Sequence, residues 1–467
     1  MSFAFRYSRI LCLCLFLFPL SAITQAPRLK FRHIGSEQGL SNSTIESIYQ
    51  DSRGFIWFGT RDGLNRYDGH QMAVYRYDQK DTNSISDNYI RYIYEDRNDA
   101  LWIGTTNGLN RFNTNRNNFT RFKHNASDPK TISHNLITCI HEDKKGNLWV
   151  STFGGGINLL QTDQNSFIRF LKTEKQGSIS DNRVNFLYED SHDNFWVGTQ
   201  NGLNLYNRQS RSFRLVPIGT SPANKANDVI RIIKEDINGN LLLGTEENGL
   251  IILNPEKHYV RQYRHQEKNA SSLASNLIRS ILVDRKQNIW IGSVNGGLNL
   301  FHPDSDSFSH YQNEPDNIFS LSQRTVSSLF EDNQGNLWVG THRGGVNLHT
   351  PNTEKFTLYR QKANGNSLSY NDVKTFCEDR NGNLWIGTDG GGLNLFDRNK
   401  NTFKHYKYNP YDPQSIGSNE VLGVTEDSKG NLWVATWGGG LCLLNKQTGK
   451  FTRYVNDPSN KYSISSN

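Results

Sequence analysis

The sequence predicts an all-β fold, a β-propeller of four-stranded antiparallel blades, from three observations. A tryptophan recurs every 45 to 48 residues, at Trp57, Trp102, Trp149, Trp196, Trp290, Trp338, Trp385 and Trp433, and Leu242 stands where one is missing. An aspartate precedes each of these nine positions by six residues. The 467-residue chain combines 39 Gly and 12% aromatic residues with 21% charged residues, which is typical of short strands joined by turns. A period of about 40 to 50 residues indicates a propeller or a solenoid.

Each unit contains four candidate strands, as residues 371–406 illustrate. The first, 371–379, carries Ile or Val six residues before the aspartate and another apolar residue three before it, as it does in all nine units. Residues three apart lie on opposite faces of a strand, so both faces are expected to be buried. The other strands are 384–388, 392–396 and 403–406. Units that cannot bury their own faces are typical of propeller blades.

Two repeated features also have functional interpretations. Tryptophans can stack on sugars, but a fixed strand position in eight of nine units predicts packing between blades. The turn at 379–383 has the Asp, Asn and Gly residues of a hairpin turn. An EF-hand calcium loop needs Gly at its sixth position and Glu at its twelfth, and this turn has neither. We therefore predict structural roles for both features, with no metal site and no cofactor.

The first strand candidate stands alone. Residues 31–34 match the fourth strand of a unit but have no preceding three strands. Such a strand closes a ring, because it completes the last blade and removes an open edge. If it pairs with the third strand of the unit that contains Trp338, the ring has seven blades; pairing with the Trp433 unit would contradict that number. Residues 463–467 match the beginning of a tenth unit, so we expect the sequence to be a piece of a longer protein.

The units that carry Leu-Trp-Ile-Gly-Thr and Gly-Gly-Gly-Leu-Asn, as at 384–394, resemble the two-component regulator propeller repeat. The opening, with Gly-Leu-Ser-Asn at 39–42 and Ile-Trp-Phe-Gly-Thr-Arg-Asp-Gly-Leu-Asn-Arg-Tyr-Asp-Gly at 56–69, is similar to the start of periplasmic sensors of hybrid two-component histidine kinases of Bacteroidetes type. The resemblance covers 31–467 and implies two consecutive seven-bladed propellers, a small β-sandwich, a membrane helix and a cytoplasmic kinase.

On this basis we expect one complete seven-bladed propeller at 28–351. The first two blades of an incomplete second propeller, and the beginning of a third, are expected at 352–467, with 356–359 as its first outer strand. The number seven comes from the resemblance alone. This chain contains no kinase, receiver or DNA-binding segment, so the membrane would be reached only through a missing downstream region.

The N-terminus predicts export. Arg6 and Arg9 precede an apolar stretch at 10–20 and a small-residue tail, which together indicate a signal peptide at 1–26. The stretch is shorter than the roughly 20 residues of a membrane-spanning helix. We expect a periplasmic protein whose full-length form is anchored in the inner membrane. Outside this segment three cysteines, Cys139, Cys377 and Cys442, occupy apolar strand positions, and we expect them to be buried and unpaired.

Candidate ligand-binding residues lie in the turn between the second and third strands of each unit. This turn and the loop that leads to the next unit are expected on one face, around the axis of the propeller. Two variable positions hold bulky or charged residues where a turn needs only Gly, Asn or Asp. The candidates are Arg61, Asp62, Phe153, Glu246, Glu247, His342, Arg343 and Trp437. Drift on an exposed loop explains a single such residue equally well.

We expect the chain to bind and not to catalyse. The leading hypothesis is an extracytoplasmic sensor region that recognises a small molecule or, as the resemblance implies, an oligosaccharide. The alternatives are a propeller-scaffold polysaccharide lyase or hydrolase, for which His342 and Arg343 with Glu246 and Glu247 are the only loose cluster, and a protein-binding scaffold. The net charge of +7 is spread along the chain without a basic block, which excludes a nucleic-acid footprint. A homodimer in the full-length receptor is left open.

Overall fold

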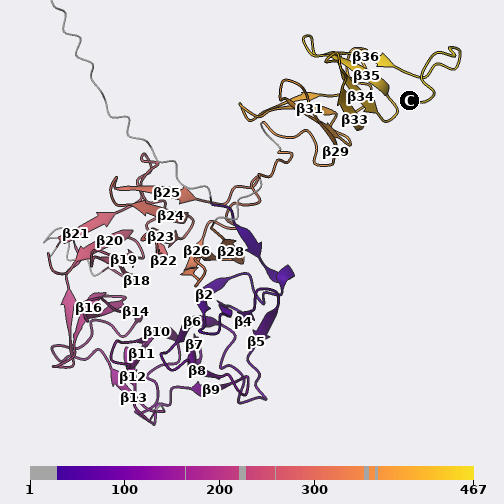
Figure 1. Ribbon diagram of the computed structural model, residues 1–467. Coiled ribbons are helices and arrows are strands. Elements are labelled where there is room, and N and C mark those ends of the chain that lie inside the picture. The colour runs from indigo at the N-terminus through magenta and orange to yellow at the C-terminus, as the bar shows by residue number, and fades with distance from the viewer. Residues whose placement is uncertain (1–28, 164, 220–227, 258, 352–356, 363–365) are drawn as a thin grey trace, which may run out of the picture. The chain divides into compact units, whose positions relative to one another are not determined.

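The structure, a computed structural model, describes residues 29–467 except 164, 220–227, 258, 352–356 and 363–365. These residues form nine four-stranded antiparallel sheets (Figure 1). The only helix in the described ranges is the short 3-10 helix η1, Ser36–Gln38. The chain divides into two compact units, Met1–Pro351 and Asn352–Asn467.

Seven sheets belong to the first unit and are the blades of one ring. Blades 1 to 3 consist of β2 to β13: Ile45–Gln50, Ile56–Thr60, Gly63–Tyr67, Met72–Tyr75; Ile90–Glu95, Leu101–Thr105, Gly108–Asn113, Asn118–Phe122; Ile137–Glu142, Leu148–Thr152, Ile157–Leu160, Phe167–Phe170. Blades 4 to 6 consist of β14 to β25: Val184–Glu189, Phe195–Thr199, Gly202–Asn207, Ser212–Val216; Ile230–Glu235, Leu241–Thr245, Leu250–Asn254, Tyr259–Tyr263; Ile278–Val283, Ile289–Ser293, Gly297–His302, Ser307–Tyr311. Blade 7 contains β26 to β28, Val326–Glu331, Leu337–Thr341 and Val346–His349, together with β1, Arg32–Ile34.

The N-terminal strand closes the ring. β1 pairs antiparallel with β28, and the register places Arg32 opposite Leu348 and Ile34 opposite Val346. The outer strand of blade 7 therefore comes from the other end of the unit, and the ring has no open sheet edge at its junction. The predicted pairing with the Trp338 unit, and with it the predicted propeller of seven blades plus the beginning of a second, is confirmed.

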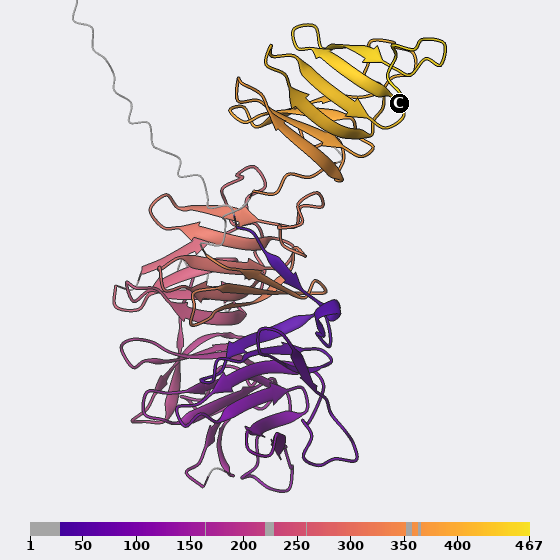
Figure 2. The same ribbon diagram turned by 45° about the vertical axis from the view of Figure 1, so that its right-hand side comes forward.

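The first strand of each blade lies innermost. In Figure 1 the strands β2, β6, β10, β14, β18, β22 and β26 surround the axis of the ring. In each blade the following strands are hydrogen-bonded in sequence order outward from it. Figure 2 shows the blades of the ring from another side. A residue of a first strand is therefore placed close to the axis of the ring.

The repeated tryptophans pack between blades, as predicted. Trp149 is 2% exposed, and its ring centroid lies 4.9 Å from Phe195 and 5.4 Å from Tyr206, both in the next blade. Because both faces of every inner strand in the ring have a neighbour, the apolar side chains of the first strands are buried there, as Ile140 is.

The repeated aspartate holds both the turn and the tryptophan. In blade 1, Oδ1 of Asp51 accepts hydrogen bonds from the backbone N–H groups of Arg53 and Phe55, at 3.1 and 2.9 Å. Its Oδ2 accepts the indole N–H of Trp57 at 2.9 Å. The same indole bond recurs in all eight units that have the tryptophan. This bond explains the fixed spacing of six residues between the aspartate and the tryptophan. The carboxylate oxygens accept hydrogen bonds from the turn, as expected.

The second unit contains two blades. Blade 8 consists of β29 to β32, Val373–Glu378, Leu384–Thr388, Leu393–Asp397 and Thr402–Tyr406, and blade 9 of β33 to β36, Val421–Glu426, Leu432–Thr436, Gly440–Asn445 and Lys450–Tyr454. No strand forms at 357–359, although a strand was expected at 356–359; the two sheets of this unit have four strands each without it. Phe356 lies outside the described residues. Tyr359 instead packs on Phe396, with ring centroids 4.8 Å apart.

In this unit the inner strands are not buried on both faces. Phe376 in β29 is 62% exposed, and Trp433 in β34 is half-buried. Cys377 was expected to be buried and is partly exposed, whereas Cys139 and Cys442 are buried; all three are free thiols. The reason is that each of these two blades has only one neighbouring blade in the unit.

The predicted signal peptide at 1–26 lies outside the described residues. Within the described part of the chain, no helix has the length and hydropathy needed to cross a membrane.

Candidate ligand-binding site

The first strand of each blade, which lies at the axis, contains a β-bulge. The bulge turns one side chain away from the hydrogen-bonded ladder. In every first strand the register shifts across one residue, for example between Ile45 and Ser47 in β2. The residue between is left unpaired, and a bulge of this kind re-aims its side chain. In the ring these residues are Glu46, Arg91, Thr138, Asn185, Arg231, Arg279 and Ser327.

Three of the bulge residues join neighbouring blades. Thr138 donates through Oγ1 to the carbonyl of Val184 at 2.7 Å, and Asn185 donates through Nδ2 to the carbonyl of Ile230 at 2.9 Å. Ser327 makes the corresponding bond to the carbonyl of Ile45, from blade 7 to blade 1. These short polar side chains are therefore used to hold the inner strands together. The four charged bulge residues have no such bond among the described residues and are available for other contacts.

Glu46 and Arg91 belong to one polar group at blades 1 and 2. Arg61 donates through Nε to Oε1 of Glu46 at 2.8 Å, and the hydroxyl of Tyr89 donates to the same oxygen at 2.9 Å. Arg91 donates through Nη1 to the Tyr89 hydroxyl at 3.2 Å. Both guanidinium groups also lie over the Tyr89 ring, 5.3 and 5.4 Å from its centroid. Glu46 is thus neutralised by Arg61, while Arg91 has a neutral partner.

Arg231 faces Glu246, from the turn after β19. Its Nη2 lies 2.5 Å from Oε2 of Glu246, and both side chains are partly buried. The Nε of Arg231 is buried without a hydrogen-bond partner among the described residues. A buried guanidinium N–H without an acceptor costs free energy, so this atom has capacity for one more acceptor.

Arg279, in blade 6, lies near the axis, where the charged groups of blades 1, 2 and 5 act on it. Its side chain is exposed, yet desolvation lowers the pKa of its guanidinium, and the charges of Arg231 and Arg91 lower it further while Glu246 and Glu46 oppose the shift. Arg91 belongs to blade 2 and Arg279 to blade 6, so the two charges can interact only across the axis. Arg279 has no hydrogen bond or ion pair with any described residue. The Arg279 side chain is therefore partly desolvated by the protein and still accessible to solvent near the axis.

We call these six residues, Glu46, Arg61, Arg91, Arg231, Glu246 and Arg279, the axial cluster. It contains four arginines and two glutamates, a formal excess of two positive charges. Both glutamates have an arginine partner. The remaining positive charge is unneutralised at a concave site, which is the arrangement that attracts an anionic group.

Three of the turn residues predicted from sequence come together here. Arg61 and Glu246 belong to the axial cluster, and His342 lies beside it. Desolvation, followed by the charges of Arg61 and Arg343, lowers the pKa of His342. His342 is therefore held neutral at physiological pH. Glu46 opposes this shift of the His342 pKa, and Glu246 is engaged by Arg231.

The other predicted residues lie apart from the axial cluster. Asp62 pairs with Arg76 at 3.1 Å, and Phe153 is half-buried and forms an isolated bridge with Arg183. Glu247 and Arg343 are exposed, the latter with a φ of 67°. Trp437, in the second unit, is 67% exposed.

The bulge residues were missed by the sequence analysis. They follow the repeated Ile or Val directly and precede the aspartate by five residues in every unit. The sequence does contain a sign of them, because a charged residue at one fixed place in an apolar strand needs an explanation. Alternation alone, however, gives no indication of a bulge.

Comparison with known proteins identifies the repeat. The family model described as "Two component regulator propeller" matches eight segments: 39–62, 84–107, 131–154, 178–201, 272–295, 320–343, 367–390 and 415–438. The chain is a tandem array of two component regulator propeller repeats. Each matched segment contains the loop before a first strand and extends to the turn after the second.

The proteins to which this chain is similar include extracellular domains of two-component systems and a histidine kinase. The extracellular domain of a hybrid two-component system from B. thetaiotaomicron is 30% identical, with a TM-score of 0.68, over 92% of this chain and 55% of that one. A second extracellular domain from the same organism, at 22% identity and a TM-score of 0.55, covers 91% of this chain and 61% of that one, and at this identity shows the fold alone. A histidine kinase of Formosa agariphila is 42% identical over 67 residues, 14% of this chain and 5% of that protein.

This propeller-repeat chain thus spans about half the length of the first of these solved domains. The likeness supports a sensor-region role in a two-component system, outside the cytoplasm. Streptogramin B lyase shares the fold at 14% identity and a TM-score of 0.50, over 69% of this chain and 97% of that one, so the fold by itself does not distinguish binding from catalysis.

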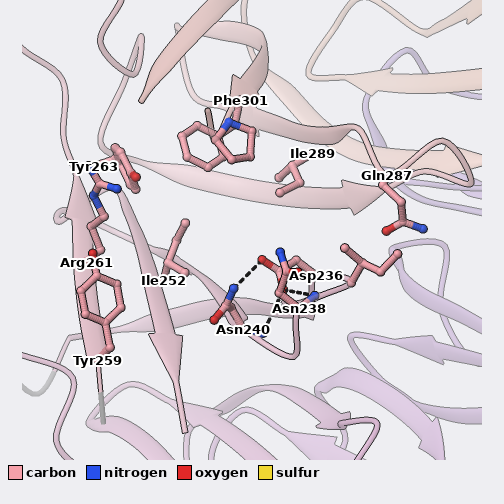
Figure 3. A pocket seen from close by; sticks show the side chains of 12 residues that line it. Asp236, Asn238, Asn240, Ile252, Tyr259, Arg261, Tyr263, Gln287, Ile289 and Phe301 are labelled. Carbon is pink, nitrogen blue, oxygen red and sulfur yellow. Dashed lines mark hydrogen bonds between the residues drawn. The ribbon is translucent and has the colours of Figure 1, made fainter. Parts of the chain in front are cut away.

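The propeller repeat that the family model passes over is blade 5, which has Leu242 in place of tryptophan. A pocket of about 220 Å³ lies between blades 5 and 6 (Figure 3). We call it the seam pocket. It is lined by Asp236, Ile237, Asn238, Asn240, Ile252, Tyr259, Arg261, Tyr263, Gln287, Ile289, Phe301 and Pro303. Its residues come from the outer strands and from the turns that follow the first strands, at the end of the blades opposite to the axial cluster.

Proposed function

We propose that this chain is the periplasmic ligand-binding region of a two-component signalling protein and that it takes an oligosaccharide at the axial cluster of the first ring. The observation that carries the proposal is Arg279, an exposed guanidinium without an ion-pair partner among the described residues, whose charge interacts with that of Arg91 across the axis. The propeller repeats and the 30% identical extracellular sensor domain support the signalling role.

The chemistry of the axial cluster favours a ligand with an acidic group. A guanidinium presents a planar set of N–H donors that matches the two oxygens of a carboxylate. Arg279 and the partnerless Nε of Arg231 supply such donors, and Tyr89 adds an aromatic face whose hydroxyl is already engaged. A uronate-bearing oligosaccharide meets these requirements, because its carboxylate is flanked by hydroxyl groups and an apolar ring face.

We propose binding without turnover. General acid–base chemistry needs a titratable pair within reach of one substrate atom. In the axial cluster each glutamate is held by an arginine, and desolvation together with the charges of Arg61 and Arg343 lowers the pKa of His342. The cluster is therefore suited to holding a charge and not to moving a proton.

Calorimetric titration of the chain tests this function. Tetragalacturonate is expected to bind and the neutral maltotetraose to bind much more weakly, with a tetragalacturonate affinity that falls as salt is raised. Arg279→Ala should weaken tetragalacturonate binding by at least about tenfold, because it removes the unpaired cation. Lys286→Ala, a change of the same charge in the turn after the same strand, is the matched control and should bind normally.

Two outcomes would overturn the proposal. One is equal binding of the two oligosaccharides, and the other is a titration in which Arg279→Ala binds tetragalacturonate as tightly as Lys286→Ala does. Chromatography of the incubated tetragalacturonate checks for turnover, and release of shorter products that disappears in His342→Ala would establish catalysis instead.

A further inference from the structure

The seam pocket occupies the place of the missing tryptophan. In blade 3 the ring of Trp149 is surrounded by Phe170, Phe195 and Tyr206, at centroid distances of 5.6, 4.9 and 5.4 Å. The residues at the corresponding positions around blade 5 are Tyr263, Ile289 and Phe301, and all three line the seam pocket. Leu242 is buried but is too short to reach the space that the indole fills in the other blades.

The aspartate that would hold the tryptophan is still present. Asp236 accepts the backbone N–H groups of Asn238 and Asn240 on Oδ1, both at 2.9 Å. Among the described residues, its Oδ2 accepts only Nδ2 of Asn240, at 2.8 Å. In the eight units that have the tryptophan, the corresponding oxygen also accepts the indole N–H. Asp236 lines the pocket, so its Oδ2 is an acceptor at the wall of the pocket (Figure 3).

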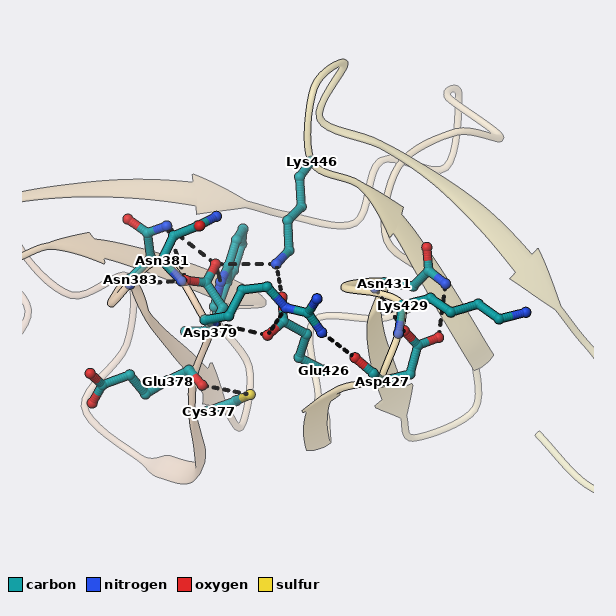
Figure 4. Close-up of polar contacts among 12 residues, drawn as sticks. Cys377, Glu378, Asp379, Asn381, Asn383, Glu426, Asp427, Lys429, Asn431 and Lys446 are labelled. Atoms are coloured by element: carbon teal, nitrogen blue, oxygen red, sulfur yellow. Dashed lines mark hydrogen bonds and ion pairs between the residues drawn. The ribbon is translucent and has the colours of Figure 1, made fainter.

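Two pairs of neighbouring blades are joined at this end by a basic side chain, and the described residues at the seam pocket form no such bridge. In blades 8 and 9, Lys446 bridges Oδ2 of Asp379 at 3.2 Å and Oε1 of Glu426 at 2.6 Å (Figure 4). Arg208 makes the same bridge to Asp143 and Glu189, at 2.7 and 2.5 Å.

At the seam the glutamate position holds Val283, and the lysine or arginine position holds Pro303. Ile237 in blade 5 corresponds to Ser191 in blade 4, whose backbone N–H donates to the carboxylate of Glu235 in the next blade. Ile237 is 72% exposed. The missing tryptophan and the missing glutamate therefore coincide at the interface between blades 5 and 6.

We propose that the seam pocket binds a small planar aromatic ring that carries an N–H donor, with the ring between Ile289, Phe301 and Tyr263 and the N–H on Oδ2 of Asp236. An apolar cavity of about 150 Å³ is enough to hold benzene. A pocket of about 220 Å³ with aromatic walls and one acceptor therefore suits an indole-sized ring. Tyr259 and Arg261 stand at the same pocket and offer polar contacts to any substituent on the ring.

Titration of the intact chain with indole, followed by calorimetry, tests the proposal. One indole is expected to bind per chain. N-methylindole, which has the same ring without the N–H, should bind at least about tenfold more weakly, because Asp236 then gains no donor. Leu242→Trp should abolish indole binding by placing the chain's own indole in the pocket, while the volume-conserving Leu242→Met should retain it.

The melting temperature of each variant is measured in parallel, so that loss of binding by an unfolded protein is recognised. Leu242→Trp is expected to melt at or above the temperature of the unaltered chain. Absence of saturable indole binding, equal binding of N-methylindole, or unchanged indole binding by a folded Leu242→Trp variant would each overturn the proposal. Arg279→Ala is expected to leave indole binding unchanged, because the seam pocket and the axial cluster lie at opposite ends of the blades.

Discussion

The backbone N–H of Asn333, in blade 7, donates a hydrogen bond to Oε1 of Gln50, in blade 1, at 2.8 Å. Within the ring, the same contact joins consecutive blades, as when the N–H of Ser52 donates to Oε2 of Glu95 at 2.7 Å. The junction between the last and the first blade is thus built like five of the other six junctions of the ring, with glutamine in place of glutamate. Together with the pairing of β1 and β28, it makes the ring continuous.

Truncation of the closing strand should destabilise the whole ring. Ile34 is buried in β1, and Ile34→Ala is expected to lower the free energy of unfolding by about 2–5 kcal/mol. Arg32→Ala, an exposed position on the same strand, is the matched control and should cost less than about 0.5 kcal/mol. Urea unfolding followed by tryptophan fluorescence measures both. Equal effects of the two substitutions would contradict a closing role for β1.

One repeat position should respond differently in the two units. Ile140 is fully buried between blades of the ring, whereas Phe376, at the same position in blade 8, is 62% exposed. We expect Ile140→Ala to cost about 2–5 kcal/mol of unfolding free energy and Phe376→Ala to cost about 0.5 kcal/mol or less. Urea unfolding of the two variants checks this, and a large loss in Phe376→Ala would show that its exposed face is covered in solution.

Stability should fall in acid as the turn aspartates are protonated. Burial alone would raise the pKa of Asp143, but hydrogen bonds from Asn147, Trp149 and Arg208 outweigh it and lower the pKa to about 2, and the pKa of Asp379 is lowered to about 2 in the same way. A carboxylate whose folded pKa lies below its unfolded value stabilises the fold above the unfolded pKa, so this stabilisation is lost as the pH falls from about 4 to about 2.

Urea unfolding between pH 2 and pH 5 measures this loss. Asp143→Asn, which cannot ionise, should show a shallower dependence of the unfolding free energy on pH than the unaltered chain. An unfolding free energy that is constant over this range would contradict the effect.

Restoration of the tryptophan in blade 5 should stabilise the ring. Leu242→Trp fills the seam pocket and supplies the indole N–H that Asp236 lacks, and cavity filling typically adds about 0.5–2 kcal/mol. Thermal unfolding is the measurement, with Leu242→Met as the control that leaves the cavity. A lower melting temperature for Leu242→Trp than for Leu242→Met would mean that the surrounding side chains have closed the space.

Loss of Arg279 should harm binding but not stability. Its neighbours Arg231 and Arg91 repel it, so Arg279→Ala is expected to leave the melting temperature unchanged or slightly higher. A residue retained at no benefit to the fold is typical of a binding site. A clear fall in the melting temperature would assign Arg279 a structural role instead.

Much of the fold could be predicted because it repeats locally. The four strands of a blade, the turn at each aspartate and the burial of Trp149 follow from spacings within about 50 residues, and these are visible in one sequence. The candidate site was predicted only in part. Arg61, Glu246 and His342 meet near the axis, but Arg279 was missed because the bulge that exposes it does not alter the apolar pattern of β22.

The sequence by itself determined that this protein is a row of similar blades with tryptophans packed between them. The tertiary structure alone decided that seven of them close into a ring, since closure depends on the pairing of β1 with β28 and on the rotation from one blade to the next. It also decided that Arg91 and Arg279, 188 residues apart, face each other across the axis. The repeat period shows which residues each blade buries against its neighbours. Only closure of the ring determines which residues meet across the axis.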